Sequence, residues 1–331
     1  PPSDRHDFWR LDEAAGTPDW LNISGHIRAR VESIDGQFRS AARLNSTDTI
    51  GFLRTALRFD FDGDVLGSDN LDFTFEVLDS RQFGAGTGSF LNTPTNNPVD
   101  ILQAYFQYDL GELGSGTNYL KLGRQTLDLG SRRLVARNRF RNTINAFTGA
   151  LWHFEDDKAK ADIFWFLPTQ RQPNDFPSLL DNDVVLDEQD KDQQFFGAFY
   201  QRESADWLTW ETYVYGIYEE NEPGSRRREL FTPGVRAFRK AAKNQWDYEM
   251  ELVLQFGETA NMDHNAGYAH LETGYTFDST WTPRVQVQFD YASGDTSSTD
   301  NDTERFNTLF GARRFEYGPT GIYGAIARSN I

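Results

Sequence analysis

The sequence of 331 residues contains no cysteine, which excludes thiol catalysis, zinc–thiolate sites and disulfides. It also lacks any run of about 18 consecutive apolar residues, so it has no candidate transmembrane helix. A basic surplus is missing: 50 acidic residues against 33 Lys and Arg give a net charge of −17, which argues against a duplex nucleic-acid binder. The start, Pro1-Pro2-Ser3-Asp4, has no signal-peptide pattern, which leaves a mature secreted form or a cytosolic protein.

Aromatic residues are abundant instead, at 15% of the chain. Mean hydropathy is nevertheless low, at −0.64. A disordered chain would be poor in aromatics, and an ordinary compact core would need more Leu, Ile and Val. This composition therefore favours neither class.

Alternation of apolar and polar residues is the strongest pattern in the chain, and no helical period of useful length accompanies it. The clearest run sets Trp246, Tyr248, Met250, Leu252, Leu254 and Phe256 against Asp247, Glu249, Glu251, Val253 and Gln255. Similar runs occupy residues 21–32, 53–61 and 284–291. Each run predicts a β-strand with one apolar and one polar face.

The same pattern predicts about fourteen strands in total. The further ranges are 71–81, 100–109, 118–127, 131–138, 145–154, 159–167, 193–202, 209–219, 229–239 and 266–277. Short turn signals alternate along the chain with long polar stretches at 35–49, 83–98, 168–192 and 294–307. Short turns at one end and long loops at the other indicate an antiparallel meander.

Two architectures fit such strands. A soluble sandwich has strands of about 5–6 residues and buries its apolar face. A membrane barrel has strands of about 9–11 residues, an apolar face toward lipid and a polar interior. The runs here are long, their polar faces carry full charges, and aromatic residues such as Trp20, Phe61, Trp246 and Phe277 stand at their ends. The pattern favours an all-β antiparallel transmembrane barrel.

The segment Leu120-Lys121-Leu122-Gly123-Arg124-Gln125-Thr126-Leu127-Asp128-Leu129-Gly130-Ser131-Arg132-Arg133-Leu134 resembles the alginate-export porin family of bacterial outer-membrane barrels. Supporting stretches are 25–32, 78–81, 103–105, 291–295 and 306–310, so the resemblance runs from about residue 20 to the end. It implies a monomeric barrel of about eighteen strands whose arginine-rich lumen passes anionic polysaccharide.

The chain also departs from that family pattern. About fourteen strands are fewer than eighteen, and residues 326–331 resemble a loop rather than a closing strand. An unclosed sheet would expose unpaired backbone groups to lipid. We therefore expect about four C-terminal strands to be missing from this sequence. Residues 1–19 are predicted as an N-terminal periplasmic segment and residues 20–331 as the barrel, incomplete at its C-terminus.

Arginine is the prominent charged residue, with 27 Arg against 6 Lys. Its planar guanidinium binds carboxylates bidentately, which suits a path for an anionic chain. The residues predicted to line this path are Arg28, Arg30, Arg54, Arg58, Asp79, Tyr105, Arg124, Gln125, Arg132 and Arg133. Arg137, Arg139 and Arg141 extend the basic segment. The alternative is structural: the arginines pair with Asp60, Glu76 and Glu249 and hold the barrel's shape.

Metal binding and catalysis have little support in the sequence. Two acidic loops, at 181–192 and 295–304, are candidates for calcium, but neither has EF-hand spacing, so solvated charge is the preferred interpretation. The five histidines form no His-Glu-x-x-His pair, and there is no nucleophile elbow. We therefore expect no cofactor and no enzyme activity.

The sequence as a whole predicts a passive outer-membrane channel for an anionic solute, and the family resemblance implies that this solute is a uronate polysaccharide such as alginate. Expected partners are that polysaccharide, outer-membrane lipid, lipopolysaccharide and periplasmic export proteins, with no nucleic acid. One alternative is a general outer-membrane porin whose lumen arginines are structural. The other is a secreted, soluble β-protein that binds or cleaves polysaccharide.

Overall fold

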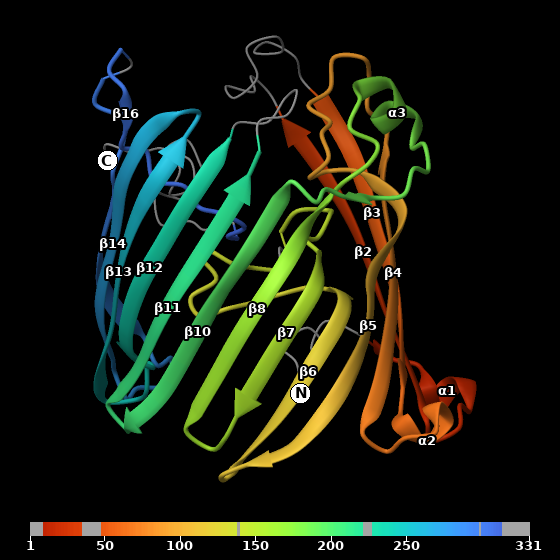
Figure 1. Ribbon diagram of the computed structural model, residues 1–331, viewed down its shortest axis with the longest axis horizontal. Helices are drawn as coiled ribbons and strands as arrows, with labels where there is room; N and C mark the ends of the chain where they lie inside the picture. The colour runs from red at the N-terminus through yellow and green to blue at the C-terminus, as the bar shows by residue number, and fades with distance from the viewer. Residues whose placement is uncertain (1–8, 35–47, 138–139, 221–226, 298, 313–331) are drawn as a thin grey trace.

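A single antiparallel sheet dominates the computed structural model, which describes residues 9–34, 48–137, 140–220, 227–297 and 299–312 (Figure 1). The sheet has 16 strands, and its main path runs β1-β2-β3-β4-β5-β6-β7-β8-β10-β11-β12-β13-β14-β15. The first eight strands are β1 (Trp9–Arg10), β2 (Leu21–Ile34), β3 (Asp48–Phe61), β4 (Leu71–Phe83), β5 (Asn97–Leu113), β6 (Gly116–Gln125), β7 (Phe147–Glu155) and β8 (Ala159–Gln170). The others are β9 (Glu188–Gln189), β10 (Gln193–Ala205), β11 (Leu208–Glu219), β12 (Arg228–Arg239), β13 (Gln245–Thr259), β14 (Met262–Thr276), β15 (Arg284–Ala292) and β16 (Asp302–Thr303).

Helices are short and lie outside the sheet. They are α1 (Asp12–Ala15), α2 (Gly63–Leu66) and α3 (Phe176–Asp181). Within the described ranges, none of them has the length or the apolar composition needed to cross a membrane.

The antiparallel meander predicted from the sequence is confirmed, with one wrong strand. Of the strand predicted at 131–138, the described residues 131–137 are not a strand: Gly130 and Arg132 have φ values of 52° and 68°, in the left-handed region that breaks an extended chain. Their apolar residues Leu134 and Val135 are buried inside the molecule instead of facing outward. The short strands β1, β9 and β16 were not predicted, because two-residue pairings leave no periodic signal.

The outer face of the sheet is apolar. In β13, Met250, Leu252, Leu254 and Phe256 are exposed, whereas Asp247, Glu251 and Gln255 are buried on the opposite face. In β15, Val285, Val287, Phe289 and Tyr291 are likewise exposed. A β-protein with its apolar side chains outward and its charges inward has the polarity expected of a sheet that faces lipid.

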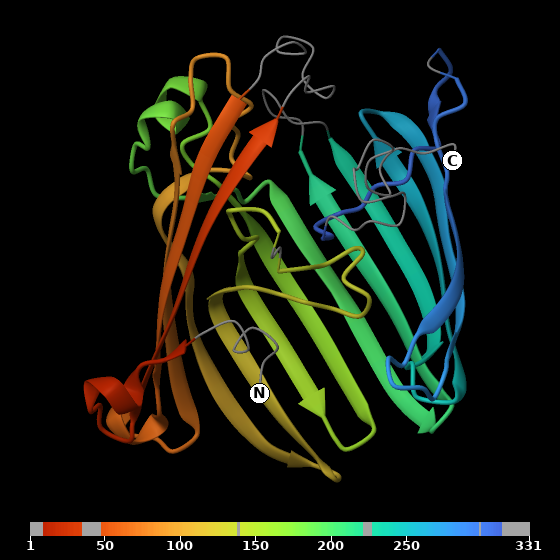
Figure 2. The same cartoon turned by 180° about the vertical axis from the view of Figure 1, so that it is seen from behind.

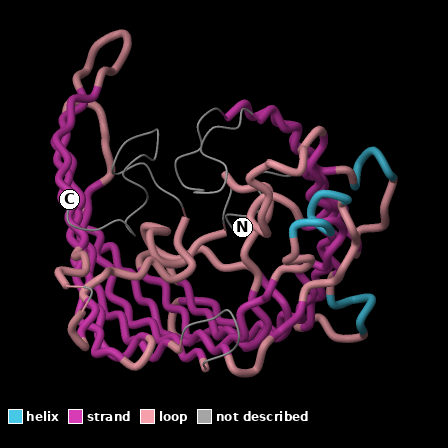
Figure 3. Tube along the Cα trace, turned by 90° about the horizontal axis from the view of Figure 1, so that it is seen from above, coloured by secondary structure: helices cyan, strands magenta, loops and turns pink. Residues whose placement is uncertain are grey.

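The sheet curls into an open trough, with loops on its concave side (Figures 2 and 3). Strand order ends at β1 on one edge and β15 on the other, and these two strands do not pair among the described residues, so the sheet is not closed. Four positions of the sequence analysis lie outside the described residues: the start of the N-terminal segment at 1–8, most of the loop 35–49, Arg139 and the C-terminal stretch 326–331.

Candidate functional site

One long connection leaves the wall and enters the trough. Between β6 and β7, residues 126–137 and 140–146, here called the inward segment, cross the concave side of the sheet (Figure 2). Leu127, Leu129, Leu134 and Val135 of this segment are buried in a cluster with ring side chains of the wall. The wall contributes Phe147, Phe164, Phe166, Phe195, Phe199, Tyr213 and Tyr215 to that cluster. The concave face is therefore partly apolar, and it holds the inward segment by packing.

A second stretch of chain joins this packing. Phe310 lies with its ring centroid 4.8 Å from that of Phe195 and 5.1 Å from that of Phe147. Its backbone N–H donates to the carbonyl of Leu134 over 2.9 Å, so the two internal segments are bonded to each other. Residues 306–310, which contributed to the family resemblance, are thus part of the interior of the trough.

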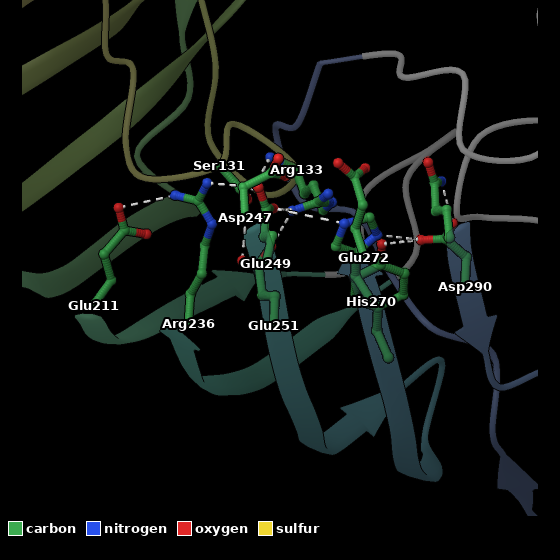
Figure 4. Close-up of polar contacts among 12 residues, drawn as sticks. Ser131, Arg133, Glu211, Arg236, Asp247, Glu249, Glu251, His270, Glu272 and Asp290 are labelled. Carbon is green, nitrogen blue, oxygen red and sulfur yellow. Dashed lines mark hydrogen bonds and ion pairs between the residues drawn. The ribbon is translucent and has the colours of Figure 1, made fainter. Parts of the chain in front are cut away.

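Arg133 fixes the inward segment to the far wall (Figure 4). Arg133 is only 2% exposed. Its guanidinium donates to Glu249 and to Glu251 of β13, both over 2.5 Å. Ser131 donates to the other oxygen of Glu251 over 3.0 Å. A cation between two carboxylates in a buried position is compensated on both sides, which makes this contact a specific anchor.

The acidic face of the wall around this anchor is neutralised by further arginines. Arg236 of β12 bridges Glu211 at 3.0 Å and Glu249 at 2.9 Å. Arg284 ion-pairs with Asp247 and Glu272. The predicted strand face of Asp247, Glu249 and Glu251 is therefore a paired network rather than a free anionic surface.

His270 and Asp290 extend this network toward β15. The imidazole Nδ1 of His270 lies 2.7 Å from Asp290, and the hydroxyl of Tyr268 donates to the same carboxylate over 2.9 Å. Arg236, Arg284 and His270 were missing from the predicted site, although each lies within a strand that the alternation identified. Assigning an inward face to those strands would have pointed to them.

The opposite wall holds the inward segment through Arg137. Its guanidinium donates to Glu76 of β4 over 2.8 Å and to Thr126 over 2.9 Å. The side-chain amide of Gln103 of β5 donates to the other oxygen of Glu76 over 2.5 Å. The segment therefore spans the trough, tied to β4 and β5 on one side and to β13 on the other.

Three of the predicted path arginines meet the same segment through its backbone. Arg28 donates to the carbonyl of Arg141 over 2.7 Å, and Arg30 donates to the carbonyl of Phe140 over 2.6 Å. Arg54 donates to the carbonyl of Arg141 over 3.3 Å. These guanidinium groups of β2 and β3 thus gather where the inward segment returns to the wall.

Arg30 also pairs with Glu32 at 2.8 Å, and the other predicted arginines lie in ion pairs as well. Arg58 pairs with Asp60 at 2.9 Å, and Arg124 pairs with Asp100 at 3.0 Å. Arg132 pairs with Asp128 at 2.9 Å.

The remaining predicted path residues are Asp79, Tyr105 and Gln125. Asp79 pairs with Arg81 at 2.9 Å. The hydroxyl of Tyr105 accepts from Arg58 over 3.3 Å, and Gln125 is buried on the concave side of β6. The structure thus distributes the predicted residues along one wall and the inward segment instead of gathering them at one point.

A cavity of about 650 Å³ lies between the inward segment and the wall formed by β3 to β8. Its lining includes Gln103, Tyr105, Tyr119, Lys121, Gln125 and Arg137. Acidic side chains also line it, among them Asp60, Asp128 and Asp162. This mixture of donors, acceptors and rings is suited to a hydrated polar solute.

The predicted calcium loops have a different arrangement. Among the described residues, no group of three or more His, Asp or Glu side chains is placed to hold a metal ion. Asp187, in the loop before β9, accepts from the Asn97 amide over 3.0 Å and from the Gln172 N–H over 2.8 Å. Burial and the neighbouring carboxylate of Asp100 raise the pKa of Asp187 to about 7.

Comparison with known proteins gives a family and a fold. The family model described as Alginate export matches residues 19–331. The chain is similar in structure to OpdO of Pseudomonas aeruginosa, with 11% identity over 88% of this chain and 67% of that one and a TM-score of 0.53. The chain is also similar to OccAB4 of Acinetobacter baumannii, with 10% identity over 86% of this chain and 84% of that one and a TM-score of 0.45. No curated protein sequence matches this chain.

An antiparallel sheet with an apolar convex face and buried charges on its concave face has the polarity of an outer-membrane β-barrel channel. The family match then makes the assignment specific: the chain belongs to the alginate export family, and its location is the bacterial outer membrane.

Proposed function

We propose that this outer-membrane channel passes an anionic polysaccharide of the alginate type by passive diffusion. The observation that carries the proposal is the family match over residues 19–331. Uronate sugars each carry a carboxylate, and guanidinium groups bind carboxylates through two parallel hydrogen bonds. Arg28, Arg30 and Arg54 on the concave face support such a solute.

The contacts of these arginines suit a solute that must also leave. Arg28 and Arg54 donate to backbone carbonyls of the inward segment. A carboxylate is a stronger acceptor than a neutral carbonyl, so a passing uronate can replace these contacts at little cost. A pore needs sites that bind well enough for entry and weakly enough for exit.

A second candidate is a general outer-membrane channel whose arginines are structural. The ion pairs of Arg58, Arg124, Arg132 and Arg133 favour it, because a guanidinium engaged by a buried carboxylate is poorly available to a solute. Both candidates are channels rather than enzymes. Lipopolysaccharide, loop calcium and periplasmic export proteins stay predictions under either one.

Single-channel recording in a planar bilayer separates the two candidates. In a salt gradient, a polyuronate channel should give a reversal potential that shows a preference for anions over cations. This preference should decrease when Arg28→Gln and Arg54→Gln are combined. Arg10→Gln is the matched control, since Arg10 is an exposed arginine near the edge of the sheet. A wild-type channel without anion preference, or one unaffected by the double substitution, would favour the general channel.

A further inference from the structure

Lys121 is an unusual cation of the concave wall. It lies on β6, only 9% exposed, and it is one of 6 lysines in the chain. Its ammonium lies 4.7 Å from the ring centroid of Tyr105 and 5.2 Å from that of Tyr119. It forms no ion pair with any described residue, whereas the buried Arg58, Arg133 and Arg137 all pair with carboxylates. An ammonium that contacts ring faces and no carboxylate is available to an anionic ligand in the cavity.

Gln125 adds a second unmet donor on the same strand face. It lies four residues along β6 from Lys121, is 2% exposed and lines the same cavity. Its side-chain Nε2 has no hydrogen-bond partner among the described residues. Buried polar groups are nearly always hydrogen-bonded, so an unpartnered amide at a cavity wall points to an acceptor supplied from outside the protein.

Gly123 explains how the rings reach this position. It lies between the two donors with φ +130°, and a Cβ there would lie 2.8 Å from the Tyr105 Cα. Because glycine leaves that space empty, the Tyr105 side chain can lie against β6 and contact Lys121. On the other side, the ring of Tyr119 stacks on His153 with centroids 4.7 Å apart. The ammonium is therefore flanked by two fixed ring faces.

Three carboxylates of the cavity wall already have partners. Asp128 pairs with Arg132, and Asp162 lies 2.7 Å from His153. Asp60 is held by Arg58. Asp62 and Asp72 also line the cavity, near the β3–β4 turn. On the β6 side of the cavity, Lys121 and Gln125 present donors, which is the chemistry that recognises a carboxylate carried on a sugar ring.

We propose that Lys121 and Gln125 form a binding subsite for one acidic sugar unit, with Lys121 on its carboxylate, Gln125 on an oxygen acceptor and the rings of Tyr105 and Tyr119 holding the ammonium in place. This subsite rests on the proposed function, because it names the point where the passing polysaccharide is held. It lies on β6 facing the inward segment, separate from the arginine group of β2 and β3.

The test is block of single-channel current by a uronate oligosaccharide, with a neutral oligosaccharide of the same length as the comparison probe. Lys121→Met removes the charge-assisted contact and is expected to weaken block by about 10-fold or more. Lys121→Arg should retain block. Gln125→Leu should weaken it by about 3-fold. Lys240→Met, which removes an exposed lysine after β12, is the matched control, and the uronate oligosaccharide should block its current as strongly as it blocks the wild type.

The outcomes separate the subsite from the function on which it rests. If the uronate oligosaccharide blocks Lys121→Met as strongly as the wild type, the subsite is overturned and the polyuronate channel stays in place. Absence of any block in the wild type overturns both. Each variant is first checked for heat-modifiable migration in detergent gels, which reports a folded barrel. If Lys121→Met fails this check, Lys121→Arg and Gln125→Leu carry the test, and unchanged block in Gln125→Leu overturns the subsite.

Discussion

Individual arginines do two kinds of work in this protein. Arg58, Arg133 and Arg137 are buried against carboxylates, and the sequence interpretation named their partners Asp60, Glu249 and Glu76 as candidates for structural pairing. The sequence could not reveal which arginine pairs with which acid. Arg133 and Glu249 lie far apart in the sequence, and they meet only because the inward segment crosses the trough to β13. Arg28 and Arg54 donate to backbone carbonyls of the inward segment.

Arg133 is the residue whose loss should matter most for the inward segment. Arg133→Met leaves the buried Glu251 without its cation and Glu249 with Arg236 alone, which is expected to cost about 3–5 kcal/mol. Chemical unfolding in detergent measures the total, and hydrogen exchange at residues 126–137 localises it. Arg10→Met, at an exposed ion pair, should change the free energy of unfolding by about 0–1 kcal/mol. A loss for Arg133→Met as small as that of the control would contradict the anchoring role.

At the scale of elements, alternation predicted strands well and internal segments poorly. β13 and β15 show why the strands were predictable: one face meets an apolar medium and the other a polar interior, so the pattern has period two. Residues 131–138 show the limit. Leu134 and Val135 pack on rings of the concave wall, and such packing imposes no strand period on the sequence. The subsite at Lys121 was missed for a related reason. The sequence does not show which side chains pair with one another, so it cannot show that Lys121 has no carboxylate partner.

The loop between β8 and β10 should respond to pH through Asp187. Because burial beside Asp100 raises the pKa of Asp187 to about 7, the folded loop binds a proton that the unfolded chain releases near its usual pKa. The loop is therefore most stable below about pH 4, loses stability as pH rises to about 7, and changes little above it.

Hydrogen exchange of residues 171–189 at several pH values measures this effect. Asp187→Asn should abolish the pH dependence of protection in that loop. Protection that rises between pH 4 and 7 in the wild type would contradict the assignment.

The molecule as a whole is a curved wall with inverted polarity, and its outer surface makes a further prediction. Leu252 lies at the middle of β13 and faces outward. Leu252→Arg should destabilise folding into lipid vesicles by about 2–4 kcal/mol, because the charge would enter the centre of the bilayer. Val285→Arg, near the end of β15, should cost about 0–1 kcal/mol. Equal costs at the two positions would contradict the proposed orientation in the membrane.

The central claim, passage of an anionic polysaccharide, is tested most directly by flux into proteoliposomes. Vesicles containing the full-length native protein are given a labelled uronate oligosaccharide and, in parallel, a neutral oligosaccharide of equal length. Faster entry of the uronate oligosaccharide, reduced in the combined Arg28→Gln and Arg54→Gln variant, is the predicted result. Equal entry of both sugars, or entry of the neutral sugar alone, would contradict it.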